Sequence, residues 1–344
     1  MSKSINSLKS ICIIRLSSIG DITHMIPIIK TLQVHSPMTN ITWIIGKTEY
    51  HLVKNIKNIE FIVINKRSFI ETIMILLKLR KKSFDVLLHM QVSLRSNLMT
   101  LFIRAKRKIG FDKDKSKNFH NLFINESIDS SGKKHVLETF FYFLSKIGLK
   151  EKEYSKDINI EDPKISIFSS KEKYMVFNPF TSSRKFNYRE WDINNYKIII
   201  DYLANNYGIS SVIIGGHSEY ELEKSNLFSK KNNVKNMVGK TNLQDVYSLI
   251  KSSELYIGPD SGTLHIASML LKPVIGLYAT SNPLRTGPYY GMKYTINKYP
   301  EALMIFNKKT EDTAKWGERI RDKNAMSLIK TEDVINSIDK ILKL

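Results

Sequence analysis

A carboxylate stands shortly after the first apolar run of the chain. The run SICIIRL at residues 10–16 is followed by a short polar segment with Ser18, Gly20 and Asp21, and then by a helical pattern. The dipole of a helix keeps an aspartate near its N-terminus ionised. Two interpretations stay open. Asp21 is only a helix cap, with Gly20 in the turn, or Asp21 is a general base that takes the proton from an attacking hydroxyl.

A second polar loop, GPDSGTLH at residues 258–265, stands between a strand pattern and a helical pattern. The free N–H groups at the start of such a helix bind anions and suit a pyrophosphate. Gly262 would let a phosphate approach the backbone, and His265, in the first helical turn, could donate to a phosphate oxygen. In the alternative interpretation, Asp260 or Ser261 caps the helix and His265 is a packed side chain. The loop is not a P-loop, and the chain contains no GxGxxG.

Two further loops follow strand patterns in the second half of the chain. NPFTSSRK at residues 178–185 combines hydroxyls with Arg184 and Lys185, which would neutralise a leaving diphosphate. GGHSE at residues 215–219 places Glu219 after two glycines, where an acid could hold ribose hydroxyls and the glycines could admit a flat base. The alternatives are an exposed polar turn and a glutamate that only favours a helix start.

A basic segment lies in the first half. Gln91 and Arg95 follow the end of a predicted strand at His89, and Arg95 could face a ligand there. Further bases follow at Arg104, Lys106, Arg107, Lys108, Lys113, Lys115 and Lys117. This run is either a solvated face or a site for acceptor phosphates or an anionic membrane.

Strand patterns alternate with helical patterns, which is typical of βαβ units around a parallel sheet. The first half predicts strands at 10–16, 40–45, 60–64 and 84–89, and helices at 22–35, 69–82, 93–105 and 133–147. The second half predicts strands at 174–178, 211–215, 254–258 and 274–278, and helices at 193–206, 219–230, 243–252 and 263–271, with helical pattern again in 316–344. Ligands bind such sheets beyond the carboxyl ends of the strands, where the loops above are expected to lie.

Two domains are expected. Residues 148–170 are charged, contain Pro163 and lack a long periodic pattern, so they are the best linker candidate. The fold class is therefore α/β, with two Rossmann-like domains at 1–165 and 166–344, each with a parallel sheet, and with the final helix as a candidate to pack back on the first domain.

Composition bounds the function classes. Hydrophobic residues make up 42% of the 344 residues, enough for two cores. The single cysteine, Cys12, excludes an intramolecular disulfide and a thiolate metal cluster, and its apolar run predicts burial. No secretion signal or membrane-spanning helix is evident, since the best apolar stretch, 69–79, is short and interrupted by charges. We therefore expect a cytoplasmic protein without a metal site, because the eight histidines show no metal spacing.

The net charge is strongly positive. Lys and Arg number 53 against 33 Asp and Glu, which gives +20. Such an excess attracts nucleic acids, anionic membranes or phosphorylated substrates, although a bias toward Lys, Ile and Asn would also produce it. A nucleic-acid-binding protein is one alternative, but the chain contains no recognisable module of that kind.

Taken together, three motifs resemble the bacterial heptosyltransferases of glycosyltransferase family 9. They are RLSSIGDITHMIP, NPFTSSRK and GPDSGTLHIASMLLKPVIGLYATSNPLRTGPYYG, in the family's order over nearly the whole chain. Residues 109–123 and the segment WGERIRDKNAM are similar to the heptosyltransferase I-like branch. The resemblance implies a GT-B fold with two domains facing a cleft, and an inverting, metal-independent transfer of heptose from ADP-heptose to a Kdo residue of the lipopolysaccharide inner core.

The resemblance also implies roles for individual residues. Asp21 matches the family's proposed general base, in an N-terminal acceptor domain where Ser18, Gly20, Gln91 and Arg95 are the acceptor candidates. The candidates for donor binding in the C-terminal domain are Thr181, Ser182, Arg184, Lys185, Glu219, Asp260, Ser261, Gly262, Thr263 and His265. The partners implied are a nucleotide sugar and an anionic glycolipid, with peripheral contact to the inner membrane and no nucleic acid.

The sequence departs from the family at a few positions. His89 and Val92 stand where an aspartate and a glycine are frequent, and Ser261 stands where threonine is usual. Lys185 is shifted, so Arg184 is an alternative for its role. A transferase or epimerase that uses another nucleotide sugar is the alternative within enzymes.

Overall fold

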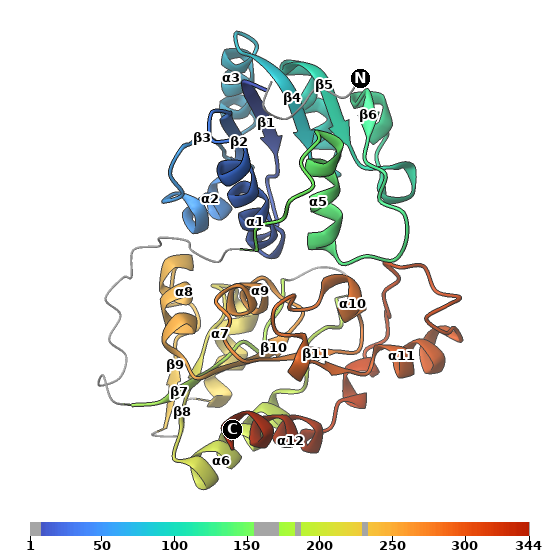
Figure 1. The fold of residues 1–344 in the computed structure, drawn as a ribbon. Helices are drawn as coiled ribbons and strands as arrows, with labels where there is room; N and C mark the ends of the chain where they lie inside the picture. Colours follow the sequence, from blue (N-terminus) through green and yellow to red (C-terminus); the bar gives the residue numbers. More distant parts are fainter. Residues whose placement is uncertain (1–7, 155–171, 183–186, 229–232, 344) are drawn as a thin grey trace. The chain divides into compact units, whose positions relative to one another are not determined.

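The computed structural model describes residues 8–154, 172–182, 187–228 and 233–343. The chain forms two compact units, Met1–Glu161 and Asp162–Leu344, each built around its own sheet (Figure 1). The predicted domain boundary, between residues 165 and 166, falls outside the described residues.

The first unit contains a six-stranded parallel sheet in the order β3-β2-β1-β4-β5-β6. The strands are β1 (Ser10–Ile14), β2 (Asn40–Gly46), β3 (Ile59–Ile64), β4 (Ser83–His89), β5 (Arg104–Gly110) and β6 (Glu126–Ser127). The helices are α1 (Ile19–His35), α2 (Lys47–Val53), α3 (Phe69–Leu79), α4 (Leu94–Met99) and α5 (Val136–Lys146). Because β1 pairs with β4 in the register Ile14↔His89, the loops that follow these two strands lie side by side.

Ile-rich strands place apolar side chains on both faces of this sheet, as expected where helices cover both. One face carries Cys12, Ile14 and Leu87, which form a core cluster with Leu76 and Leu79 of α3. Cys12 is fully buried as predicted, and burial raises the pKa of its thiol.

The second unit repeats the arrangement in the order β12-β11-β10-β7-β8-β9. Its strands are β7 (Tyr174–Phe177), β8 (Ser210–Ile213), β9 (Val234–Asn236), β10 (Leu255–Pro259), β11 (Val274–Tyr278) and β12 (Ile296–Asn297). Its helices are α6 (Ile193–Tyr207), α7 (Glu219–Ser225), α8 (Leu243–Ser252), α9 (Gly262–Met269), α10 (Pro283–Thr286), α11 (Tyr299–Ala302) and α12 (Thr331–Leu342). The final helix α12 packs within this unit, where Val334 and Ile338 join the core and Asp339 accepts hydrogen bonds from Tyr202 and Tyr207.

The α/β class and the two parallel sheets are thus confirmed, but two predicted elements are wrong in part. Of the helical pattern expected at 316–344, only a 3-10 turn at Ala325–Leu328 and α12 from Thr331 are helical among the residues described there. The helix expected at 93–105 ends at Met99, a 3-10 turn covers Thr100–Phe102, and strand β5 begins at Arg104. Pairing with β4 overrides the weak strand propensity of the segment RAKRKIG, in which Arg104 and Lys106 point to solvent. Helix α1 begins at Ile19, three residues before the predicted start, which places Asp21 inside its first turn.

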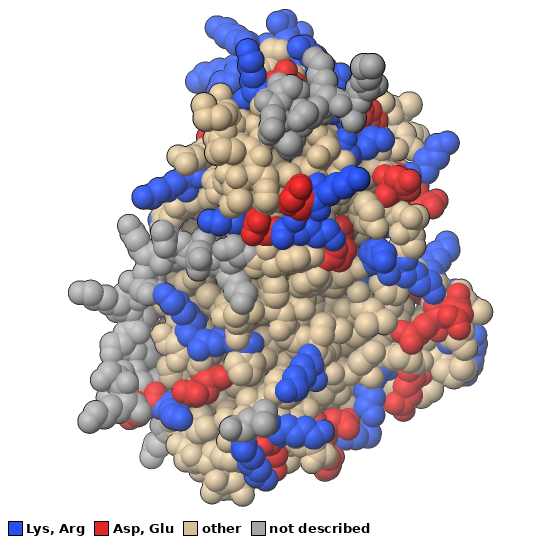
Figure 2. All heavy atoms as spheres, in the orientation of Figure 1, with Lys and Arg blue, Asp and Glu red and all other residues tan. Residues whose placement is uncertain are grey.

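Positive charge is distributed over both units. On the face drawn in Figure 2, Lys and Arg side chains are scattered over the whole surface and gather at the top of the first unit. Among the described residues, no helix is long and apolar enough to cross a membrane.

Candidate functional site

The turn between β1 and α1 holds Asp21 by one of its two carboxylate oxygens. The backbone N–H and the hydroxyl of Ser18 both donate to Asp21 Oδ2, each at 3.0 Å. Arg15, which directly follows β1, forms an ion pair with the same oxygen. Within the first unit, none of the described contacts ends on Oδ1. Since the Asp21 side chain is 28% exposed, the carboxylate keeps one oxygen for a ligand while the other fixes its position.

The surroundings of Asp21 keep it ionised. Burial alone would raise its pKa, but the Arg15 guanidinium and the hydrogen bonds from Ser18 outweigh burial and hold the pKa below its usual value. Arg15 is fixed in turn, because it donates to the carbonyl of Met90 and its guanidinium lies 5.0 Å from the centre of the Phe140 ring. Asp21 therefore accepts a proton only from a group whose acidity rises during a reaction.

Gln91 supports the same turn from the neighbouring strand end. Its Oε1 accepts the backbone N–H groups of Leu16 at 2.9 Å and Ser17 at 3.2 Å. The structure thus brings Gln91 to the Asp21 loop, where its amide oxygen is already occupied by backbone N–H groups, and its role as an acceptor-binding residue stays a prediction. Gly20 is buried in the first turn of α1 and Arg95 is exposed in the first turn of α4; the described contacts do not connect Arg95 to Asp21.

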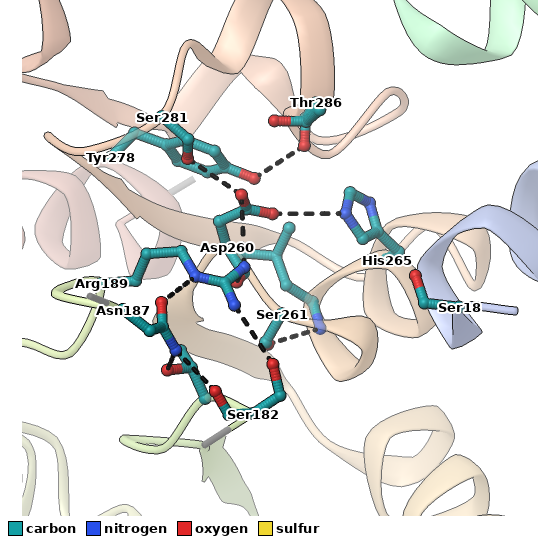
Figure 3. Close-up of polar contacts among 12 residues, drawn as sticks. Ser18, Ser182, Asn187, Arg189, Asp260, Ser261, His265, Tyr278, Ser281 and Thr286 are labelled. Carbon is teal, nitrogen blue, oxygen red and sulfur yellow. Dashed lines mark hydrogen bonds and ion pairs between the residues drawn. The ribbon is translucent and has the colours of Figure 1, made fainter. Parts of the chain in front are cut away.

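In the second unit, the turn between β10 and α9 contains a buried Asp260 (Figure 3). Its Oδ2 accepts the Ser281 hydroxyl at 2.9 Å and lies 3.6 Å from the Arg189 guanidinium, and its Oδ1 lies 3.7 Å from His265 Nε2. Burial would raise the pKa of Asp260, but its contacts with His265, Arg189 and Ser281 lower it to about 2. The anionic Asp260 therefore orients the His265 ring at the start of α9.

The start of α9 is fixed by a hydroxyl network. Thr263 Oγ1 lies 2.7 Å from the Tyr256 hydroxyl and 3.1 Å from Ser261 Oγ, and Asn178 Nδ2 donates to it at 2.7 Å. The structure places Thr263 toward β7 and β10, and Ser261 at the N-cap of α9. Gly262 is the first helical residue and adds no side chain over the backbone N–H groups that an anion would approach, while Ser261 Oγ accepts the N–H of Leu264 at 3.5 Å.

The loop after β7 is joined to this turn through Arg189. The Arg189 guanidinium donates to the Asp260 carbonyl at 2.7 Å, to Asn187 Oδ1 at 2.7 Å and to Ser182 Oγ at 3.4 Å. Thr181 donates its backbone N–H to Glu190 at 2.8 Å. Thr181 and Ser182 are thus brought to the β10–α9 turn, whereas Arg184 and Lys185 lie outside the described residues.

Glu219 occupies the first position of α7 and is exposed. The capping contacts of that helix belong to Glu221, which accepts the Ser218 hydroxyl at 2.9 Å and its backbone N–H at 3.4 Å. Glu219 therefore lies in solvent at the start of α7, beyond the carboxyl end of β8.

The residues that hold the candidate groups in place are not among the predicted site residues: Arg15, Asn187, Arg189 and Ser281. Arg15 lies inside the quoted RLSSIGD motif, so a cation six residues before the candidate base was a usable signal. Arg189 and Ser281 lie 71 and 21 residues from Asp260 along the chain, and no local spacing points to them. Among the described residues, no group of three or more His, Cys, Asp and Glu side chains comes together as a metal site would require.

Solved structures share this fold over nearly the whole chain. A glycosyltransferase family 9 protein from Veillonella parvula has a TM-score of 0.76 at 20% identity, with 99% of this chain and 98% of that chain covered. The Escherichia coli heptosyltransferase WaaC with ADP has a TM-score of 0.74 at 19% identity, with 96% and 99% covered. Two α/β units, each with a parallel sheet and with loops of this kind at its strand ends, make up the GT-B fold.

The family follows from sequence. The model of glycosyltransferase family 9 (heptosyltransferase) matches residues 74–316. The lipopolysaccharide core heptosyltransferase OpsX of Haemophilus influenzae is 34% identical over 340 residues, which is 97% of each chain. The chain therefore belongs to glycosyltransferase family 9, and the resemblance seen in its motifs is confirmed.

Proposed function

We propose that this protein transfers heptose from ADP-heptose to a Kdo residue in the inner core of lipopolysaccharide, with inversion at the anomeric carbon. The heptose and the core acceptor are supported by the similarity to OpsX, and the adenine nucleotide by the ADP bound to the similar WaaC. The observation in this chain that carries the proposal is the carboxylate of Asp21, which is held ionised through Oδ2 and has Oδ1 available.

The proposed chemistry is a single displacement. The acceptor hydroxyl oxygen forms a bond to the anomeric carbon while the bond from that carbon to the donor phosphate oxygen breaks. The hydroxyl proton passes to Asp21 Oδ1, and the electron pair of the broken bond leaves with ADP. Because the pKa of Asp21 is lowered, proton transfer is favourable only once the C–O bond has formed in large part and the hydroxyl has become acidic. One base and one displacement give inversion.

In this proposal, the β10–α9 turn stabilises the negative charge of the leaving diphosphate. His265, held beside Asp260, can donate a hydrogen bond to a phosphate oxygen, and the N-terminus of α9 supplies positive potential there. Ser182 and Arg189 lie beside the same turn. These groups would neutralise the leaving group without a metal ion, so we propose a metal-independent transfer with no cofactor.

A lipid-linked acceptor also suggests where in the cell the enzyme works. A lipid-linked acceptor and a net charge of +20 support an enzyme that works at the cytoplasmic face of the inner membrane through peripheral contact. A donor other than ADP-heptose, as in the nucleotide-sugar epimerases and other transferases, is the remaining alternative.

A transfer assay tests the proposal. Purified protein is incubated with ADP-heptose and a Kdo-bearing lipid A acceptor, and the product is read by mass spectrometry. A mass gain of one heptose is expected, with α- and β-linkage distinguished by NMR of the product. No gain, with ADP-mannose or a UDP-sugar accepted instead, would overturn the donor assignment, and a gain only on acceptors without Kdo would overturn the acceptor assignment.

A further inference from the structure

Helix α3 is apolar on two opposite sides, although one side faces solvent. Its inner side places Leu76 and Leu79 in the core of the first unit. Its outer side exposes Phe69, Ile70, Met74 and Leu77, which are 79, 74, 56 and 49% accessible. A helix with apolar side chains on all sides is normally buried by other parts of a globular protein. The outer side of α3 is therefore a surface that a partner would be expected to cover.

The neighbouring segment extends this apolar surface. Leu94, Leu98 and Leu101 recur at i, i+4 and i+7 along α4 and the 3-10 turn that follows it, and they are 54, 46 and 63% exposed. This spacing places the three side chains on one face of the segment. Since α3 contacts the 3-10 turn, the two apolar faces belong to one region, which we call the α3–α4 surface.

Basic side chains border the α3–α4 surface. An open groove of about 460 Å³ lies between the end of α3 and the start of β5. Its wall includes Leu101 and Phe102 together with Arg80, Arg104, Lys106 and Lys108. Figure 2 shows Lys and Arg side chains gathered at the top of the first unit, where α3 ends and β5 begins in Figure 1.

Part of this charge is not compensated. Lys106 lies 3.8 Å from Asp85, and Lys82 pairs with Glu60. Arg80 and Arg104 are exposed and have no acidic partner among the residues that the structure describes. The region therefore combines exposed apolar side chains with free guanidinium groups, and an occupant must offer both an apolar interior and negative charge.

We propose that the α3–α4 surface docks on an anionic lipid bilayer, with the exposed side chains of α3 and α4 entering the acyl boundary and Arg80 and Arg104 contacting lipid phosphates. A bilayer offers acyl chains directly below a layer of phosphates, which matches apolar side chains bordered by long basic ones. This inference deepens the proposed peripheral membrane contact. The groove lies at the amino ends of β4 and β5, whereas Asp21 follows the carboxyl end of β1, so the two can be changed separately.

Vesicle co-sedimentation tests the proposal with the full-length protein. The vesicles contain phosphatidylcholine alone or phosphatidylcholine with 30% phosphatidylglycerol, and neither contains an acceptor glycolipid or a nucleotide sugar. Lipid binding therefore succeeds or fails independently of sugar transfer. The wild-type protein is expected to bind the anionic vesicles at least tenfold more tightly than the neutral ones, and to lose that preference at high salt.

Two variants with matched controls separate the apolar and the charged contributions. Met74→Gln with Leu77→Gln is compared with Met304→Gln and Ile305→Gln, whose side chains in the second unit are 53 and 42% exposed. Arg80→Gln with Arg104→Gln is compared with Lys224→Gln and Lys323→Gln, which are also exposed. We expect about tenfold weaker binding for the apolar pair, about fivefold weaker binding for each charge removed from the α3–α4 surface, and wild-type binding for both controls. Thermal melts confirm that each variant is folded.

Three results would overturn the proposal. The first is no binding of the wild-type protein to anionic vesicles. The second is equal binding by the α3–α4 variants and their controls. The third is self-association of the wild-type protein, measured by sedimentation velocity without lipid, together with no binding to vesicles. If the Met74 and Leu77 changes then dissociate the self-associated protein, the surface binds a protein partner and not a bilayer.

Discussion

Arg15 and Asp21 form an ion pair across the turn between β1 and α1, and it engages only Oδ2 of the carboxylate. The hydrogen bonds from Ser18 end on the same oxygen. The carboxylate is therefore held in one orientation and one protonation state while Oδ1 stays available. Such an arrangement suits a base that must be charged before the acceptor arrives and that takes the proton late in the displacement.

Asp21→Asn removes the base and keeps the shape of the side chain. We expect turnover to fall by about 10²- to 10⁴-fold, because general base catalysis contributes on that order, with little change in ADP affinity. Product formation measured by mass spectrometry and ADP binding measured by calorimetry give the two quantities.

Asp245 offers a matched control for this variant. It occupies the same third helical position in α8, where its Oδ2 accepts the Asn242 N–H at 2.8 Å. Asp245→Asn removes the equivalent contact to the helix cap and should leave turnover unchanged. Near-normal turnover of the Asp21→Asn protein would remove Asp21 as the base.

Arg15→Met tests the electrostatic role of the ion pair. Arg15 lowers the pKa of Asp21, so loss of the guanidinium raises it. Because only the ionised carboxylate accepts a proton, the acid limb of the kcat profile is expected to move to higher pH in the variant. Wild-type and variant profiles between pH 4 and 8 measure the shift, and Arg15→Lys, which retains the charge, should restore much of the wild-type profile. Superimposable profiles for wild type and Arg15→Met would contradict the assignment.

The strand-end loops could be predicted from sequence because each is one short stretch of chain. SICIIRL followed by SSIGD, and the segment GPDSGTLH, carry strand, turn and helix signals in order, and parallel sheets place such loops at one edge. The apolar strands of both sheets were found for the same reason. Within these loops, the residue types that can bind an anion or accept a proton can be recognised directly in the sequence, and these are Asp21, Asp260 and His265.

The supporting contacts could not be predicted in this way. Gln91 holds the Leu16 and Ser17 backbone across 75 and 74 residues, and Arg189 reaches Asp260 across 71. Such contacts depend on tertiary packing and leave no periodic signal. Strand β5 was missed for a related reason: its exposed Arg and Lys residues do not favour a strand, and only pairing with β4 makes it one.

His265→Ala is expected to weaken ADP binding about 10- to 100-fold, because a hydrogen bond to a charged group contributes roughly 1.5–3 kcal/mol. Titration calorimetry with ADP measures the change, and adenosine, which has no phosphate, provides the control ligand. Adenosine should bind wild type and variant equally. If ADP affinity is unchanged, His265 does not contact the diphosphate and the donor assignment of the β10–α9 turn is wrong.

Asp260 should make stability depend on pH in a defined window. Its pKa is about 2 in the folded protein, against the ordinary aspartate value of 3.8 that applies to the unfolded chain. A lowered folded pKa contributes stability that is fully present above pH 3.8 and is lost as the pH falls through 2. The difference corresponds to about 2 kcal/mol. Asp260→Asn should therefore lower the melting temperature at pH 7, and its deficit relative to wild type should shrink as the pH falls below 4.

Substitutions of Arg189, which contacts Asp260, test stability and ADP binding together. Arg189→Gln leaves the buried Asp260 without its guanidinium and releases the Ser182 contact, so both stability and ADP affinity should fall. Breaking a buried pair by removing one partner costs about 3–5 kcal/mol. Arg189→Lys keeps the charge but cannot make the contacts to Asn187 and the Asp260 carbonyl together, so it should recover most of the stability and less of the ADP affinity. Thermal melts and calorimetry on the three proteins separate the two effects. Equal ADP affinity across all three would show that Arg189 stabilises the fold of the turn without positioning it for the donor.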